Sequence, residues 1–187
     1  EYPYEGSIMY NGCELRNAAD NVRSGIISYL GHDPELFNDS VRNNVLLGDD
    51  YDVFEYLRAV CMDKEVEAME QGADTIIGSE GIRLSGGQAQ RIALARTLCH
   101  KKLVLVLDDP FSALDRNTEE QIYKKLKDMA SDNIVILISH RLYMFPKMDK
   151  VIWMDAGKAN VGTHKELMLE CPGYRKMYET VSVEECR

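Results

Sequence analysis

The chain has 187 residues, of which 45% are hydrophobic and 28% are charged, a balance typical of a globular protein rather than a disordered one. Its formal net charge of −9 argues against sequence-independent nucleic-acid binding, because backbone phosphates require a basic surface. The five cysteines are an odd number without a Cys-x-x-Cys pair, which disfavours a disulfide framework or a cysteine metal site and fits a reducing compartment.

The chain begins with a hairpin signal and a short apolar strand. Residues 5–15, EGSIMYNGCEL, place an Asn11-Gly12 turn between two short extended stretches, which predicts a β-hairpin. Residues 25–31, GIISYLG, form a β-branched apolar run that ends at glycine, which predicts a buried strand. Because the chain also starts abruptly and without methionine, we expect it to be a piece of a longer protein.

Helical signals follow the first strand. In residues 38–48, NDSVRNNVLLG, Asp39 or Ser40 is a candidate helix cap and Gly48 is a stop signal. Residues 51–71 are amphipathic and charged, so they predict one or two surface helices.

The second half of the chain alternates helices and strands. Residues 86–99 predict a helix, 103–107 a strand, 118–130 a helix and 134–138 a second strand. Two continuous apolar strands separated by a helix favour a parallel sheet that is buried on both faces. A hairpin over residues 149–163 and two short helices close the chain. Ligands of such sheets bind beyond the carboxyl ends of the strands, so the polar residues there are the site candidates.

The segment Ser85-Gly86-Gly87-Gln88 opens the helix predicted over residues 86–99. Its simplest interpretation is a capping box, in which Ser85 caps the helix and Gln88 bonds back to the backbone. The same geometry also makes an anion site, because free amides and the positive end of the helix dipole attract negative charge. Two glycines let a phosphate approach the backbone closely, and a cap alone does not require them. The residues alone leave both interpretations open.

Polar residues follow both apolar strands of the second half. Asp108 and Asp109 come directly after the first of them, and Pro110 prevents its continuation. One interpretation is an Asp-Pro turn. The other is a Walker B element, in which Asp108 holds Mg²⁺ and the next acid handles the attacking water. His140 ends the second strand, where it is either structural or placed to contact a transferring phosphate.

The motifs LSGGQ, LVLVLDD, SALD and SHR, in this order and spacing, resemble the nucleotide-binding domain of an ABC transporter. The resemblance extends from about residue 5 to residue 179. It implies an α/β fold with a RecA-like P-loop NTPase core over residues 1–38 and 99–187 and a helical signature lobe over about 39–98. Small antiparallel hairpins complete this expected, N-terminally incomplete cassette. DTIIGSEGIRLSGGQ and GTHKELMLECPGYRKMYE further resemble the x-loop and closing helices of exporters, which makes an exporter the preferred subclass.

The resemblance implies roles for the residues at the strand ends. Asp108 matches the magnesium aspartate, Asp109 the catalytic acid and His140 the switch histidine. Asp115 matches the D-loop. His32, within SYLGHDPELF, stands at the Q-loop position that normally contacts Mg²⁺ and senses the transport domain.

The resemblance also implies partners. Ser85, Gly86, Gly87 and Gln88 match the signature that touches ATP held by a partner cassette. The implied cofactors are ATP and Mg²⁺. The implied partners are a second cassette, in a head-to-tail homo- or heterodimer, and a transmembrane transport domain, with no nucleic acid. The implied location is the cytoplasmic face of the cell membrane.

One departure from the family pattern is the absence of a Walker A loop. A P-loop requires glycine, four residues and then Gly-Lys-Ser/Thr. The only Gly-Lys pair, Gly157-Lys158, is followed by alanine. Truncation upstream explains this absence better than evolutionary loss does, so we expect the chain by itself to bind ATP weakly or not at all and not to hydrolyse it.

Other departures from the family pattern are substitutions at the catalytic-acid, Q-loop and x-loop positions. Asp109 stands where the family has glutamate, and one methylene less pulls the carboxylate back by about an ångström. His32 stands where the family has glutamine, and imidazole is a poor ligand for Mg²⁺. In the x-loop, Ser79 replaces the expected acid, with Glu80 beside it.

These departures suggest a degenerate cassette. Because cassettes of this family pair head to tail, Asp109 and His32 belong to the chain's own site, whereas LSGGQ belongs to the partner's site. One hypothesis is that the chain is the degenerate member of an asymmetric pair, which hydrolyses ATP slowly at its own site but completes the site of its partner. The alternative is a homodimer in which both sites hydrolyse ATP slowly. A DNA-repair or chromosome ATPase is disfavoured, because the short stretch between His32 and Leu84 leaves no room for a coiled coil. A soluble two-cassette translation factor is an alternative that the acidic balance does not favour, because ribosome binding requires a basic surface. A non-hydrolytic regulatory nucleotide-binding module remains open because of Asp109.

Overall fold

The computed structural model of the chain describes residues 5–10, 12–79 and 81–184. The chain divides into two compact units, Glu1–Ile138 and Ser139–Arg187. The mixture of helices and strands and the parallel sheet confirm the predicted α/β class. Within the described residues, none of the helices combines the length and the apolar character needed to cross a membrane.

The first unit begins with the predicted hairpin. Strand β1 (Met9–Tyr10) pairs antiparallel with β2 (Cys13–Glu14). Gly12 has φ +79°, a left-handed conformation that suits glycine, whereas Asn11 of the predicted turn lies outside the described residues. A 3₁₀ turn (Leu15–Asn17) and helix α1 (Asp20–Ile26) then lead into the sheet, and the sequence patterns did not predict this helix.

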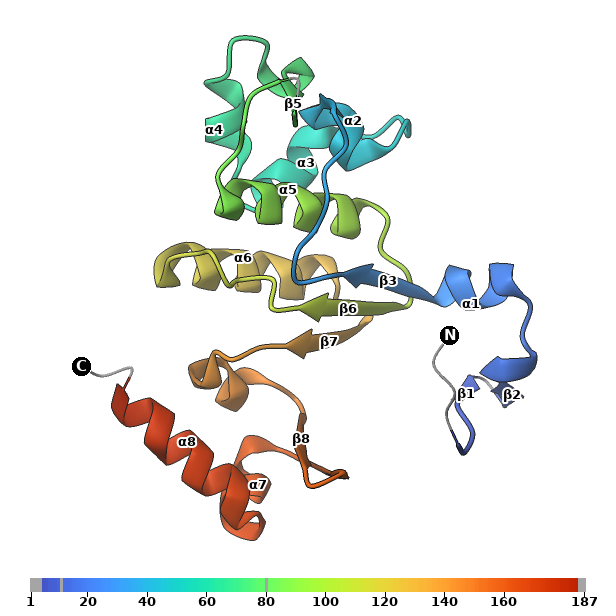
Figure 1. The fold of residues 1–187 in the computed structure, drawn as a ribbon, viewed down its shortest axis with the longest axis vertical. Helices are drawn as coiled ribbons and strands as arrows, with labels where there is room; N and C mark the ends of the chain where they lie inside the picture. The colour runs from blue at the N-terminus through green and yellow to red at the C-terminus, as the bar shows by residue number, and fades with distance from the viewer. Residues whose placement is uncertain (1–4, 11, 80, 185–187) are drawn as a thin grey trace. The chain divides into compact units, whose positions relative to one another are not determined.

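The centre of the first unit is a three-stranded parallel sheet in the order β3-β6-β7 (Figure 1). Its strands are β3 (Ile27–Leu30), β6 (Val104–Asp108) and β7 (Ile134–Ile138). Helix α6 (Arg116–Met129) connects β6 to β7, as the alternation of helix and strand predicted. Because all three strands run in the same direction, their carboxyl ends meet at one edge of the sheet.

Within the first unit, helices cover one face of the sheet only, and the predicted burial of both faces is not seen in this unit. Leu30, Leu105 and Leu107 point to the buried face, where helix α5 (Gly86–Cys99) contacts β3. Figure 1 shows α5 and α6 on the same side of the sheet, which leaves the other face without a helix from this unit. The apolar side chains exposed on that face by 40–61% are Ile27, Tyr29, Ile134, Ile136 and Ile138.

A group of helices lies between β3 and α5 in the sequence. It contains α2 (Val41–Leu46), α3 (Val53–Ala59), α4 (Asp63–Glu67) and a 3₁₀ turn (Gly72–Asp74), with β4 (Asp39–Ser40) paired antiparallel to β5 (Ile76–Ile77). As predicted, Ser40 caps α2 by accepting a hydrogen bond from the Asn43 amide, and the left-handed Gly48 follows the helix. The apolar faces of α2 and α3 pack against α5, with Val45, Leu57 and Leu94 fully buried.

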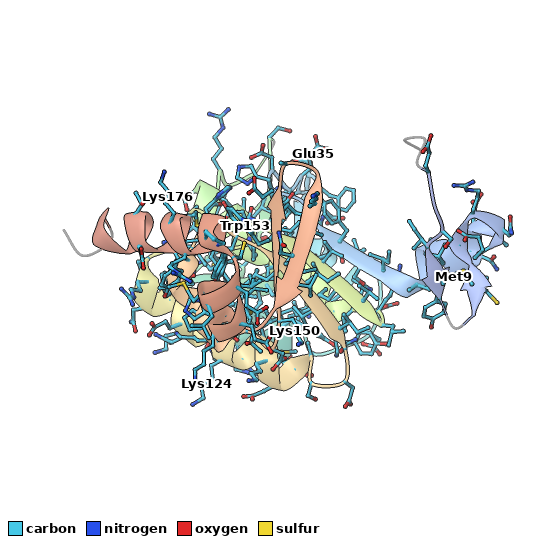
Figure 2. All side chains as sticks on the ribbon, turned by 90° about the horizontal axis from the view of Figure 1, so that it is seen from below. Met9, Glu35, Lys124, Lys150, Trp153 and Lys176 are labelled. Atoms are coloured by element: carbon cyan, nitrogen blue, oxygen red, sulfur yellow. The ribbon has the colours of Figure 1, made fainter. Side chains whose placement is uncertain are left out.

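The second unit confirms the predicted hairpin and closing helices. A 3₁₀ segment (Leu142–Lys147) precedes β8 (Val151–Asp155), β9 (Lys158–Gly162), α7 (His164–Glu170) and α8 (Pro172–Glu184). Its core contains Val151, Leu167 and the fully buried Tyr174. Trp153, labelled in Figure 2, packs edge-on against Tyr174 with the ring centroids 5.9 Å apart. This aromatic cluster gives the short segment a core of its own.

Candidate functional site

Asp108 is the last residue of β6, at the carboxyl edge of the sheet. Its Oδ2 atom accepts a hydrogen bond of 3.3 Å from the hydroxyl of Tyr29 on β3. Desolvation raises the pKa of Tyr29, and the negative charge of Asp108 and the hydrogen bond to it act in the same direction. Tyr29 thus stays a neutral donor that orients the carboxylate. Its placement beside Asp108 follows from the strand register and was not predicted from the sequence.

Asp109 is held at the same edge in an unusual backbone conformation. Its φ is +46°, a left-handed value that costs energy for a residue with a Cβ atom. Its amide donates to the carbonyl of Ile138 at 2.8 Å, which ties the end of β6 to the end of β7. The residue is 9% exposed. The backbone is therefore fixed by the sheet, and the reach of the carboxylate is set by the length of the side chain.

His32 lies beside Asp109. Its Nδ1 atom is 3.9 Å from the Asp109 Oδ2, with the His32 side chain 58% exposed and that of Asp109 13% exposed. The structure thus brings together His32, Asp108 and Asp109, as expected for the ends of neighbouring parallel strands. It also places the two residues that depart from the ABC transporter pattern next to each other.

The donor atoms at this edge suit magnesium only in part. The Asp108 carboxylate is a hard oxygen ligand, and one or two carboxylates with waters and phosphates are the usual shell of Mg²⁺. The imidazole of His32 does not suit it. Within residues 5–10, 12–79 and 81–184, no three His, Cys, Asp or Glu side chains are arranged to hold a metal ion. Asp108, the residue predicted to hold the ion, has a carboxylate whose oxygen atoms fit it.

His140 lies two residues after β7 ends, at the start of the second unit, and its side chain is exposed. Its contact with a phosphate stays a prediction. Asp115 has a clear local role as the N-cap of α6, because its carboxylate accepts hydrogen bonds from the amides of Asn117 and Thr118 and from the Thr118 hydroxyl. The side-chain hydrogen bond from Thr118, followed by the backbone ones, lowers the pKa of Asp115. Its D-loop role also stays a prediction.

The capping box at the start of α5 is confirmed. The Gln88 amide donates to the Ser85 Oγ at 3.2 Å, and the Gln88 Oε1 accepts from the Ser85 amide at 2.9 Å. The two glycines differ in their surroundings. A Cβ atom on Gly87 would lie 2.8 Å from the carbonyl oxygen of Ala113, whereas one on Gly86 would meet nothing within 4 Å. Packing within the chain explains Gly87, and only Gly86 faces open space that a ligand could enter.

This difference predicts that two matched alanine substitutions will differ in how much they destabilise the fold. We expect Gly87→Ala to lower the free energy of unfolding by about 1–3 kcal/mol, because the new methyl group collides with a backbone oxygen. Gly86→Ala is expected to change it by less than about 0.5 kcal/mol, since the site is open. Urea unfolding of both variants measures the difference. Equal effects would show that Ala113 yields to the methyl group.

Three of the predicted segments line one cavity of about 400 Å³. Its lining includes His32, Gly86 and the Ser112-Ala113 pair, which lies between Asp109 and the α6 cap. Segments that are far apart in the sequence therefore meet around one space.

Arg96 and Asn44 hold the segment after His32 against α5. The Arg96 guanidinium donates to the carbonyl and side-chain oxygens of Asn44, at 2.6 and 2.8 Å, and to the carbonyl of Glu35 at 3.0 Å. The fully buried Asn44 also donates to the carbonyls of Phe37 and Ser40. Burial lowers the pKa of Arg96. Neither residue was predicted, because no sequence pattern signals this long-range contact.

Comparisons with known proteins agree with the geometry. The model of the family described as "ABC transporter" matches residues 1–112. The ATP-dependent lipid A-core flippase of Hahella chejuensis is 35% identical over 185 residues, which cover 95% of this chain and 32% of the flippase. ABC transporter B family member 1 of Dictyostelium discoideum is 34% identical over 176 residues, which cover 91% of this chain and 19% of that protein.

A solved structure shows the same fold. The structure of a bacterial Atm1-family ABC exporter with ATP bound superposes with a TM-score of 0.89 at 30% sequence identity, covering 97% of this chain and 33% of that one. The chain thus spans about a third or less of the length of these relatives.

Proposed function

The chain belongs to the ABC transporter family, and on that premise we propose that it is the ATP-binding cassette of an exporter, which couples ATP binding and hydrolysis to transport across a membrane. One observation carries the proposal. His32, Asp108 and Asp109 converge at the carboxyl edge of a parallel sheet, on a chain whose capped helix α5 presents the LSGGQ signature. The names of the relatives, which include a flippase and ATP-binding/permease proteins, support the exporter subclass.

In this proposal the chain's residues divide between two nucleotide sites. At its own site, Asp108 binds the metal, Asp109 orients the attacking water and His140 contacts the transferring phosphate. Mg²⁺, when bound with ATP, neutralises charge that develops on the phosphates. Ser85, Gly86, Gly87 and Gln88 complete the site of a second cassette, for which the open side of Gly86 leaves room. Asp115, the N-cap of α6, is the D-loop residue of this proposal.

We further propose that the chain's own site is degenerate. Asp109 and His32 replace a glutamate and a glutamine, and their side chains lie 3.9 Å apart, so both changes affect one place. In an asymmetric pair such a site holds nucleotide and turns over slowly, while the intact signature serves the partner. A homodimer would contain two slow sites instead. A purely regulatory nucleotide-binding module is the second candidate function, which the short side chain of Asp109 favours. Nucleotide-driven closure of a dimer without any turnover would support that module.

The proposed assembly includes a second cassette, head to tail, and a transmembrane transport domain. In that arrangement the cassette lies at the cytoplasmic face of the membrane. Relatives that combine ATP-binding and permease functions support a transport domain in the same protein.

We expect the 187-residue chain by itself to bind Mg-ATP weakly or not at all, because the lysine, the amide cradle and the Mg²⁺ hydroxyl of a P-loop are missing from it. A chain extended upstream through a P-loop is expected to bind it. Calorimetry on both chains tests this, with Asp108→Asn in the extended chain as the control for metal-dependent binding. Tight binding by the 187-residue chain would contradict the expectation that ATP binding depends on a P-loop.

A further inference from the structure

Glu65, in the short helix α4, contacts the signature from a different part of the chain. Its Oε2 atom accepts a hydrogen bond from the Gln88 Nε2 at 2.8 Å. Its Oε1 atom forms an ion pair with the Arg91 Nη1 at 2.7 Å, in which the Arg91 side chain is 12% exposed and that of Glu65 41% exposed. Arg91 also donates to the carbonyls of Cys61 and Gly87, at 2.8 and 3.2 Å. One carboxylate therefore engages two side chains of helix α5.

This contact determines which way the side-chain carboxamide of Gln88 faces. An ionised carboxylate only accepts hydrogen bonds, so the NH₂ end of Gln88 must point to Glu65. The oxygen end then points to the backbone amide of Ser85 and completes the capping box. With the amide turned over, its NH₂ group would face the N–H of Ser85, donor against donor, and the box would be lost. Glu65 thus selects the one orientation of Gln88 that closes the cap.

The electrostatics agree with an ionised Glu65. Burial opposes ionisation, but the hydrogen bonds from Gln88 and Arg91 and the charge of Arg91 outweigh it, and the pKa of Glu65 is lowered. The guanidinium neutralises the carboxylate, which would otherwise repel a phosphate near the start of α5.

The capping box also decides which amides of α5 stay available. The backbone amide of Gln88 donates a hydrogen bond to the Ser85 hydroxyl, and the backbone amide of Ala89 donates to the Ser85 carbonyl. Among the described residues, the amides of Gly86 and Gly87 are the ones left without a hydrogen-bond acceptor at the positive end of this 14-residue helix. Both polar ends of the Gln88 side chain are used within the chain, which makes Gln88 a residue that shapes the signature.

We propose that Glu65 is a positioning residue for the signature: it orients Gln88, and through Gln88 it presents the Gly86 and Gly87 amides to the nucleotide of the partner cassette. This rests on the proposed function, in which the signature completes the partner's site. Glu65 acts before the cassettes close, so it governs the ATP concentration needed for closure rather than the rate of the chemical step.

The test is Glu65→Gln in the full-length transporter, which keeps the shape of the side chain but places an NH₂ group against Gln88 or Arg91. We expect the ATP concentration for half-maximal closure, measured by fluorescence transfer between the cassettes, to rise about fivefold. Turnover at saturating ATP is expected to stay within about twofold. Glu67→Gln, an exposed acid on the same helix, is the matched control and is expected to leave both values unchanged.

A second background separates positioning from simple support of the helix. In a Gln88→Ala protein, Glu65→Gln is expected to add nothing, because its intermediary is gone. A persisting fivefold effect there would overturn the proposal, since it would place the action in the Arg91 pair alone. Ser85→Ala serves as the reference for the proposed function. If Ser85→Ala leaves closure unaffected, the proposed function fails; if it impairs closure and Glu65→Gln does not, only the role of Glu65 fails.

Discussion

Replacing Asp109 by glutamate in the full-length transporter is expected to raise ATP turnover at the chain's own site by up to about a hundredfold. The added methylene moves the carboxylate outward by about an ångström, toward the water that it is proposed to orient. The backbone of Asp109 is tied to Ile138 by a hydrogen bond of 2.8 Å, so the substitution acts through side-chain length. Phosphate release at saturating Mg-ATP, with the partner's site disabled, measures the effect.

The neighbouring His32 allows a second test, of coupling between the two substituted positions. His32 lies 3.9 Å from the Asp109 carboxylate, so His32→Gln combined with Asp109→Glu is expected to depart from additivity. Without a disabled partner site, a homodimer gains at both sites, whereas an asymmetric pair gains at one slow site beside a fast one. Unchanged turnover in Asp109→Glu would remove the main support for a degenerate site.

Replacing Asn44 by alanine is expected to lower the free energy of unfolding by about 3 kcal/mol. The side chain is fully buried, accepts from the Phe37 amide and from Arg96, and donates to the Phe37 and Ser40 carbonyls. Its removal leaves several of these groups buried without a partner and loosens the segment that follows His32. The midpoint and slope of urea unfolding measure the loss.

Asn43, the preceding residue on helix α2, is the matched control. It is exposed, and its side chain donates to the carboxylate of Asp39 at 2.9 Å. We expect Asn43→Ala to cost less than about 0.5 kcal/mol, because water replaces the lost hydrogen bond. Similar losses for the two variants would show that the Asn44 and Arg96 contacts do not stabilise the fold.

The features that the sequence determined by itself are local. The capping box of Ser85 and Gln88, the cap at Ser40 and the two hairpins need only residues a few positions apart, and all of them are present. The parallel strands were predictable because a continuous apolar run has few other stable places in an α/β protein. The LSGGQ motif and its companions were likewise sufficient to indicate the family.

The features that only the tertiary structure decided join segments that are distant in the sequence. The proximity of His32 to Asp109, the contact of Gly87 with Ala113 and the hold of Glu65 on Gln88 depend on how helices and strands pack. Sequence patterns record which face of an element is apolar and not what covers it. The sheet shows this most clearly, since the sequence of its strands predicts burial on both sides and yet Ile136 is 40% exposed, on the face that has no helix from its own unit. The physical reason is that burial belongs to pairs of surfaces, whereas hydrophobic periodicity describes only one surface of each pair.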